Sequence, residues 1–142
     1  MVADVDFVLE VTGSDASAQN ALAESQNKYL ANMMRCILHA ADLGPEYWSF
    51  GLRHAVYIKN RLPHVYIKKT PYEAMTNSKP DITDLRTFGC RVHAKNPGKR
   101  PAKIDHHTSN GIFVGFTVTT KNVYFIDDRT LNVKIGTHAT LD

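Results

Sequence analysis

The sequence predicts an α+β fold in which helices come first and strands follow. Two observations support this class. Up to about residue 76 the apolar residues recur at steps of three and four, which is typical of amphipathic helices. After Phe88 they occur in short runs rich in Val, Ile, Phe and Tyr, which is typical of strands. Because helices and strands are segregated along the chain, we expect two unlike modules rather than one alternating α/β unit.

The first predicted helix begins at Asn20, a suitable N-cap residue, and continues to about Ala41. Its apolar residues gather on one side: Leu22, Tyr29, Leu30, Met33, Met34, Ile37 and Ala41. We expect the second helix to cover this side around Trp48 and Leu52, or this side to drive self-association, because large exposed apolar patches rarely persist on monomers.

Three charged residues of this helix, Glu24, Lys28 and Arg35, fall within about 40° of one another on the opposite side. A carboxylate near the start of a helix is stabilised by the helix dipole and needs no functional explanation. The position of Glu24 is therefore consistent both with simple solvent exposure and with a site.

Two further helices are predicted from their end signals. Gly44-Pro45 ends the first helix and begins a second, which Leu62-Pro63 stops. Thr70-Pro71-Tyr72-Glu73 is a capping box with proline at the first helical position, which predicts a short third helix to about Thr76.

Four strands are predicted over residues 89–94, 111–118, 122–126 and 131–135. Asp127-Asp128-Arg129-Thr130 predicts a hairpin turn between the last two strands. Residues 96–101, which include two prolines and a glycine, predict a loop after the first strand.

The composition is that of an ordinary globular protein of 142 residues, with 43% hydrophobic and 22% charged residues. No apolar run approaches the roughly 20 residues of a membrane span, and the chain does not open with a signal-peptide pattern. Cys36 and Cys90 are far apart and form no CxxC motif, which favours a reducing compartment. We therefore expect an intracellular protein of the nucleus or cytoplasm that is not secreted and does not bind membranes.

The basic residues are concentrated in the middle of the chain. Residues 53–103 contain twelve basic and three acidic residues, whereas residues 1–52 contain two basic and seven acidic ones. A block this basic is able to bind a polyanion, because Lys and Arg release counterions when they neutralise phosphates. A solvated basic face that serves solubility is the alternative.

Several common kinds of active site are not indicated. Cys36 and His39 are three residues apart and His106 and His107 are adjacent, but no paired spacing of structural-zinc type occurs. The glycines do not form a phosphate-binding loop, and no Cys-His or serine-triad signature is present.

A series of short segments does occur in a characteristic order: Gln19-Asn20-Ala21-Leu22-Ala23-Glu24 with Asn27, Arg35-Cys36-Ile37-Leu38, Tyr47-Trp48, Ala55-Val56-Tyr57-Ile58-Lys59-Asn60-Arg61-Leu62-Pro63, Lys69-Thr70-Pro71-Tyr72-Glu73, Lys79-Pro80-Asp81, Leu85-Arg86-Thr87-Phe88-Gly89-Cys90 and Gly111-Ile112-Phe113-Val114-Gly115-Phe116. In order and spacing this series, over about residues 19–142, resembles the C-terminal part of the integrase in copia-type (Ty1/copia) retrotransposon Pol polyproteins.

The resemblance implies a fold and three segments. Residues 1–63 would be the C-terminal helices of an RNase H-like integrase core, truncated at its start. Residues 64–87 would be a linker with a short helix, and residues 88–142 a small SH3-like β-barrel of the retroviral polymerase type.

The resemblance also implies a role for Glu24, as the third carboxylate of a D,D-E triad. Strand transfer in the full-length family uses Mg²⁺ or Mn²⁺, because two divalent ions stabilise the attacking and leaving oxygens. The two upstream aspartates of the triad have no counterpart here, since Asp4, Asp6 and Asp15 lack the expected strand context. Glu24 would bind metal only with the full triad present, so we expect this fragment to need no cofactor and to be inactive alone.

The function that the resemblance implies is DNA integration, retained here as non-specific DNA binding. The expected DNA-binding residues are Lys28, Arg35, Lys68, Lys69, Lys95, Lys99, Arg100 and Lys103. The main alternative is a degenerate or domesticated remnant that acts as a protein-interaction module. A self-sufficient nuclease is the third hypothesis.

Overall fold

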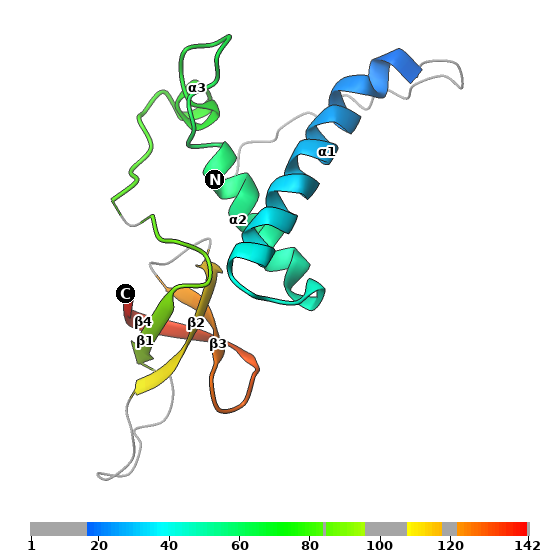
Figure 1. Cartoon of the computed structure of the whole chain (residues 1–142). Helices are drawn as coiled ribbons and strands as arrows, with labels where there is room; N and C mark the ends of the chain where they lie inside the picture. Colours follow the sequence, from blue (N-terminus) through cyan, green and yellow to red (C-terminus); the bar gives the residue numbers. More distant parts are fainter. Residues whose placement is uncertain (1–16, 84, 96–107, 118–121, 142) are drawn as a thin grey trace, which may run out of the picture.

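The computed structural model describes residues 17–83, 85–95, 108–117 and 122–141. Within these residues, helices come first and four strands follow, as predicted (Figure 1). The elements are α1 Ser17–Ala40, a 3₁₀ helix η1 Pro45–Tyr47, α2 Trp48–Lys59, α3 Pro71–Thr76, β1 Arg91–Lys95, β2 Thr108–Phe116, β3 Val123–Asp127 and β4 Val133–Leu141. No helix in the described part of the chain is both long enough and apolar enough to cross a membrane.

Helix α1 begins before the predicted N-cap. Asn20 lies inside the helix, which already includes Ser17, so the predicted start at Asn20 is wrong. The three residues before Asn20 contain neither glycine nor proline, and they therefore continue the helix instead of ending it.

Helices α1 and α2 form an antiparallel pair. Gly51 of α2 lies against α1, and a Cβ atom there would be 3.2 Å from Leu38 Cγ and 3.3 Å from Met34 Cγ. At the other end of the pair, Lys59 Nζ lies 4.3 Å from the ring centroid of Tyr29. Glycine at the closest approach lets the two backbones pack tightly.

The expected contact of α2 with α1 around Trp48 and Leu52 is made by Gly51, which lies between these two residues. The Trp48 side chain is 56% exposed, and Leu52 is half-buried. Because the helices approach each other through Gly51, α2 needs no bulky residue at the contact. Leu30 and Met33 of α1 are half-buried.

The short helix α3 forms as its capping box predicts. Thr70 Oγ1 accepts a 3.0 Å hydrogen bond from the backbone N–H of Glu73, and Pro71 occupies the first turn. The helix ends at Asn77, which adopts a left-handed conformation with φ 55°.

The strands pair antiparallel in the order β1–β2–β3–β4, and β4 returns to β1, so the pairing closes a small barrel. Two strands are longer than predicted, because β2 already begins at Thr108 and β4 continues to Leu141. The second half of β4 pairs with β1, with Thr140 opposite His93. Its small and polar residues gave no strand signal, and the pairing with a distant strand stabilises it instead.

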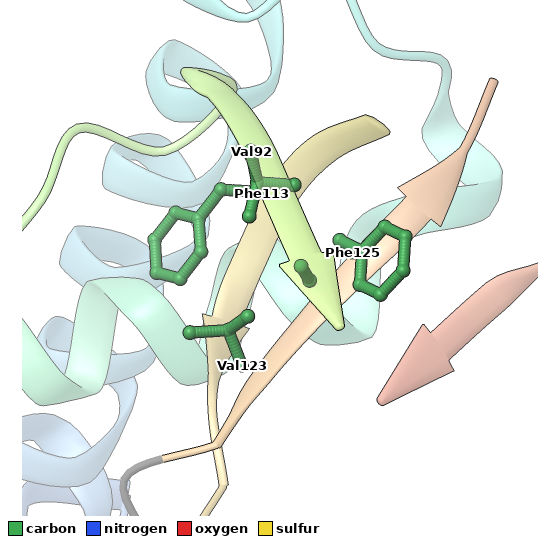
Figure 2. Close-up of a cluster of buried hydrophobic side chains, with 5 residues drawn as sticks. Val92, Phe113, Val123 and Phe125 are labelled. Carbon is green, nitrogen blue, oxygen red and sulfur yellow. The ribbon is translucent and has the colours of Figure 1, made fainter. Parts of the chain in front are cut away.

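The interior of the barrel is filled by apolar side chains. Figure 2 shows Val92, Phe113, Val123 and Phe125 close together between the strands, and all four are buried. Gly136 of β4 faces Ala94 of β1 so closely that a Cβ atom on the glycine would overlap the alanine methyl group. A small residue at position 136 is therefore required for the barrel to close.

A second apolar cluster joins the helices to the outside of the barrel. Its buried members are Leu38, Phe88, Val114 and Ile126, which come from α1, the segment before β1, β2 and β3. Phe113 and Val114 are neighbours on β2 and are both buried, because successive strand residues face opposite sides. One enters the barrel, and the other packs toward the helices.

The predicted hairpin turn between β3 and β4 is confirmed. Asp127 Oδ1 accepts hydrogen bonds of 3.0 Å from the backbone N–H groups of Arg129 and Thr130. Leu131 follows with a positive φ of 54°, and its N–H donates to the carbonyl of Asp127. The side chain of Asp127 therefore organises the turn from a buried position.

Candidate nucleic-acid interface

The three charged residues expected on the outer side of α1 are exposed. Glu24, Lys28 and Arg35 all face solvent, and Arg35 Nη1 donates a 3.0 Å hydrogen bond to Asn32 Oδ1 on the same helix. Both cations are accessible to a partner, and Glu24 lies one helical turn before Lys28.

Glu24 has no metal-binding cluster around it in the described part of the chain. Among those residues, no three His, Cys, Asp or Glu side chains are close enough to hold a metal ion together. The next charged residue on the same helix face is the cation Lys28, one turn after Glu24. Divalent metal sites in proteins are built from several hard oxygen ligands, of which Glu24 supplies one carboxylate.

Lys68 and Lys69 lie in a compact loop between α2 and α3. Two backbone hydrogen bonds of 2.9 Å close this loop, from His64 N–H to the Lys69 carbonyl and from Lys68 N–H to the His64 carbonyl. Both lysines are exposed, and so are Val65 and Tyr66 at the tip, at 85% and 89%. The loop thus presents two ammonium groups beside two uncovered apolar side chains.

Of the other four predicted basic residues, the structure describes the backbone of Lys95. Lys95 ends β1, opposite Thr108 of β2. Lys99, Arg100 and Lys103 lie outside the described residues. In Figure 1, α3, which follows the loop, lies at one end of the molecule, and β1 lies toward the other.

Two arginines that were not among the expected DNA-binding residues lie against tyrosine rings. The Arg61 guanidinium lies 3.5 Å from the ring centroid of Tyr57 and 5.1 Å from that of Tyr72. The Arg53 guanidinium lies 5.3 Å from the ring centroid of Tyr124, on strand β3. Each pair is a cation–π contact, so tyrosine rings hold these guanidinium groups in place without neutralising their charge.

The contacts of Arg61 are unusual for an arginine. Its Nη1 donates a 3.2 Å hydrogen bond to the carbonyl of Tyr57, whereas its Nε is buried and has no hydrogen-bond partner within the described residues. A buried unpaired donor costs free energy, on the order of 1–3 kcal/mol. The two ring contacts and the Nη1 hydrogen bond hold the Arg61 side chain in place despite this cost.

Arg53 and Arg61 line a groove of about 660 Å³ between α2 and strands β2 and β3. The lining residues are Phe50, Leu52, Arg53, His54, Val56, Tyr57, Asn60, Arg61, Val114, Gly115, Phe116, Thr117 and Tyr124. None of them is acidic. Burial against the rings of Phe88 and Phe113 lowers the pKa of His54, so this imidazole is neutral at pH 7.

Within the residues that the structure describes, most cations of the basic middle (residues 53–103) lack acidic partners. Of the basic side chains between residues 53 and 95 that the structure describes, only Arg91 forms an ion pair, with Asp128 at 3.1 Å. The others are Arg53, Lys59, Arg61, Lys68, Lys69, Lys79 and Arg86. Their positive charge is available to an anionic partner.

A sequence signal for the groove existed. Arg53, Tyr57 and Arg61 follow one another at steps of four, which places the first two on one face of α2 and the third just past its end. The rings of Tyr124 and Phe116 come from a distant part of the chain, and no local pattern links them to the helix.

Comparison with known proteins identifies relatives among transposon polyproteins. The chain is 30% identical to a retrovirus-related Pol polyprotein from transposon TNT 1-94 of Nicotiana tabacum over 108 residues, and this match covers 75% of the chain. It is 26% identical to the retrovirus-related Pol polyprotein from transposon RE1 of Arabidopsis thaliana over 127 residues, and this match covers 87% of the chain. The Pol polyprotein from transposon RE2 of the same plant is 27% identical over 104 residues, or 70% of this chain.

The matched part is a small share of each relative. It corresponds to 8%, 8% and 7% of the lengths of these three polyproteins. No protein-family model matches the chain, and no solved structure matches it significantly.

Proposed function

Because the chain is homologous to a segment of copia-type retrovirus-related Pol polyproteins of plant transposons, we propose that it is a DNA-binding part of the integrase region of such a polyprotein. In this proposal, α1 and α2 are the last helices of an RNase H-like core, and β1 to β4 are an SH3-like barrel. The order of helices before a small antiparallel barrel supports this reading.

One observation carries the DNA-binding proposal, namely the unpaired charge of the basic middle. Within the described residues, its cations lack acidic partners except for Arg91, and Arg53 and Arg61 are held at the junction of helices and barrel. Lys and Arg in such positions bind phosphates and carry no direct sequence information. The proposed activity is therefore weak binding that tolerates any DNA sequence.

Catalysis is not part of the proposal. Glu24 is exposed one helical turn before Lys28, and two-metal phosphoryl transfer needs several carboxylates that hold both ions. We assign to α1 a contact with DNA through Lys28 and Arg35. Glu24 corresponds to the third carboxylate of the family's catalytic triad and does not catalyse strand transfer by itself.

The test is the affinity of the full chain for duplex DNA as a function of salt concentration. We expect the logarithm of the association constant to fall linearly with the logarithm of salt concentration, with a slope of about −0.9 for each phosphate neutralised. Two duplexes of unrelated sequence should bind with the same affinity. Binding that does not change with salt, or no binding at low salt, would contradict the proposal.

A protein-interaction module is the second candidate, and one observation favours it. Val65 and Tyr66 are exposed at the tip of a loop that two backbone hydrogen bonds close. Exposed apolar side chains on a well-formed loop are typical of protein contacts, and they also permit self-association. Concentration-dependent sedimentation that disappears on Tyr66→Ser would identify this loop as a protein contact.

A further inference from the structure

The groove between α2 and the barrel combines aromatic rings with positive charge. Ring contacts run along it, with Phe50 and Tyr124 centroids 5.8 Å apart and Tyr57 and Phe116 centroids also 5.8 Å apart. Its volume of about 660 Å³ lies within the roughly 300–1,000 Å³ range of small-molecule binding sites. The groove is therefore large enough for a planar ring with a charged substituent.

The charge in the groove selects for an anion. Arg53 and Arg61 line it from α2 and from the residues just after α2, and no Asp or Glu lines it. Neither guanidinium forms an ion pair within the described chain, because each lies over a tyrosine ring instead. A flat guanidinium group and an aromatic ring are the two surfaces on which proteins stack unpaired bases.

The barrel side of the groove is open. At Gly115, which lines the groove, a Cβ atom would meet no other atom within 4 Å. The pairing of β2 with β3 shifts register between Phe113 and Gly115, so the β2 strand is bulged at this point. The bulge therefore places a residue without a side chain at the groove, where space is open.

We propose that this groove binds an unpaired nucleotide of a nucleic acid, with its base against the Tyr124 side of the groove and its phosphate at Arg53 and Arg61. The inference rests on the proposed function, because it assigns a single-stranded segment to a chain that binds DNA. Paired bases are stacked inside a duplex and are not accessible to the rings, so the groove distinguishes single strands and frayed ends from closed duplex. An acidic peptide is the competing occupant and is one arm of the test.

The experiment measures fluorescence anisotropy of the full chain with three probes. The probes are a labelled oligothymidylate, a blunt duplex of the same length, and a glutamate-rich peptide of the same net charge. The variants are Tyr124→Leu and Arg53→Gln, with Tyr124→Phe as the conservative replacement. Arg129→Gln is the matched control, because Arg129 is an exposed arginine outside the groove.

We expect Tyr124→Leu and Arg53→Gln each to weaken oligothymidylate binding at least about fivefold, which is the loss of one base–aromatic or phosphate contact. Tyr124→Phe should bind like the parent, because the ring is retained. Arg129→Gln should change affinity less than twofold, and Tyr124→Leu should leave duplex affinity unchanged.

Three results would overturn the inference. One is an unchanged oligothymidylate affinity in Arg53→Gln, whose exposed side chain is replaceable without loss of fold. Another is an equal loss of duplex and single-strand affinity in Tyr124→Leu. The third is a peptide that binds more tightly than oligothymidylate and loses affinity in both groove variants. If the parent binds no duplex at low salt, the proposed function itself fails, whatever the groove variants do.

Discussion

Lys134 Nζ donates a 2.9 Å hydrogen bond to the Asp127 carboxylate, from strand β4 to the end of strand β3. Asp127 is only 2% exposed, and its other oxygen accepts hydrogen bonds from Arg129, Thr130 and the Thr130 hydroxyl. Lys134 is the main reason that the pKa of Asp127 lies well below its ordinary value, and the turn hydrogen bonds lower the pKa further. The hairpin therefore depends on an ionised carboxylate.

The first prediction follows from the sign of this shift. A carboxylate whose pKa is lower in the folded state contributes stability above its unfolded pKa of about 3.9, and this stability is lost as the pH falls further. Asp127→Asn should lower the free energy of unfolding at pH 7 by about 1–3 kcal/mol. Urea unfolding at pH 7 and at acid pH measures the change.

The loss caused by Asp127→Asn should shrink as the pH falls below about 4, since the unfolded parent chain then binds a proton at Asp127 that the folded protein, with its lowered pKa, does not. Asp128→Asn is the control, because its ion pair with Arg91 is largely exposed and is worth at most about 1 kcal/mol. An Asp127→Asn penalty that is the same at pH 7 and at low pH would show that charge is not what stabilises the turn.

The second prediction concerns closure of the barrel. Gly136→Ala should destabilise the protein by about 1–3 kcal/mol, because the new methyl group overlaps Ala94 across the β1–β4 pairing. Chemical denaturation measures the effect. The double variant Gly136→Ala with Ala94→Gly moves the methyl group to the other strand and should recover part of the loss; no recovery would mean that the overlap is not the cause.

The third prediction concerns DNA binding by the four cations between residues 95 and 103. Neutralising Lys95, Lys99, Arg100 and Lys103 together should weaken binding to all duplex sequences alike and make the salt dependence shallower, because phosphate contacts are lost. Filter binding at several salt concentrations provides the slope. Neutralising Lys68 and Lys69 should weaken binding by a smaller factor and serves as the comparison. If the fourfold variant binds duplex DNA at low salt as well as the parent, its four residues contribute to solubility and not to DNA binding.

The fourth prediction concerns chemistry at Glu24. The chain should neither nick DNA nor join strands with Mg²⁺ or Mn²⁺, because one carboxylate does not hold two metal ions. Gel analysis of a labelled duplex should show identical products for the parent and for Glu24→Gln. Metal-dependent cleavage that disappears in Glu24→Gln would establish a complete active site and refute the prediction.

Local signals in the sequence predicted local structure well. The Thr70 cap and the turn at Asp127 both form as expected, because each depends on hydrogen bonds within four residues. The second half of β4 was missed, since its stability comes from pairing with residues more than forty positions earlier, such as Thr140 with His93. The contact of α2 with α1 lies in the predicted stretch around Trp48 and Leu52, but helical periodicity does not reveal that Gly51 lies at the contact while Trp48 stays 56% exposed.

In the candidate site, too, the features set by local sequence could be predicted, and those that depend on distant residues could not. Exposure of Glu24, Lys28 and Arg35 could be predicted from helical angles alone. The groove could not, because it requires α2 to lie against β2 and β3, which brings Arg53 to Tyr124 across 71 positions of sequence. Charge counting located the basic middle but did not show which of its members tyrosine rings hold in place.

The shared cluster of Leu38 and Val114 has a consequence for how this chain unfolds. Removing the helix pair would expose Val114 and Ile126 on the outside of the barrel, and removing the barrel would expose Leu38 on α1. Neither half is expected to keep its packing when expressed alone, so the two halves should melt in one cooperative transition. Loosening α1 would then also loosen the packing of Val114, next to the β2 bulge that borders the groove. The stability of the helices is thereby linked to the shape of the binding surface.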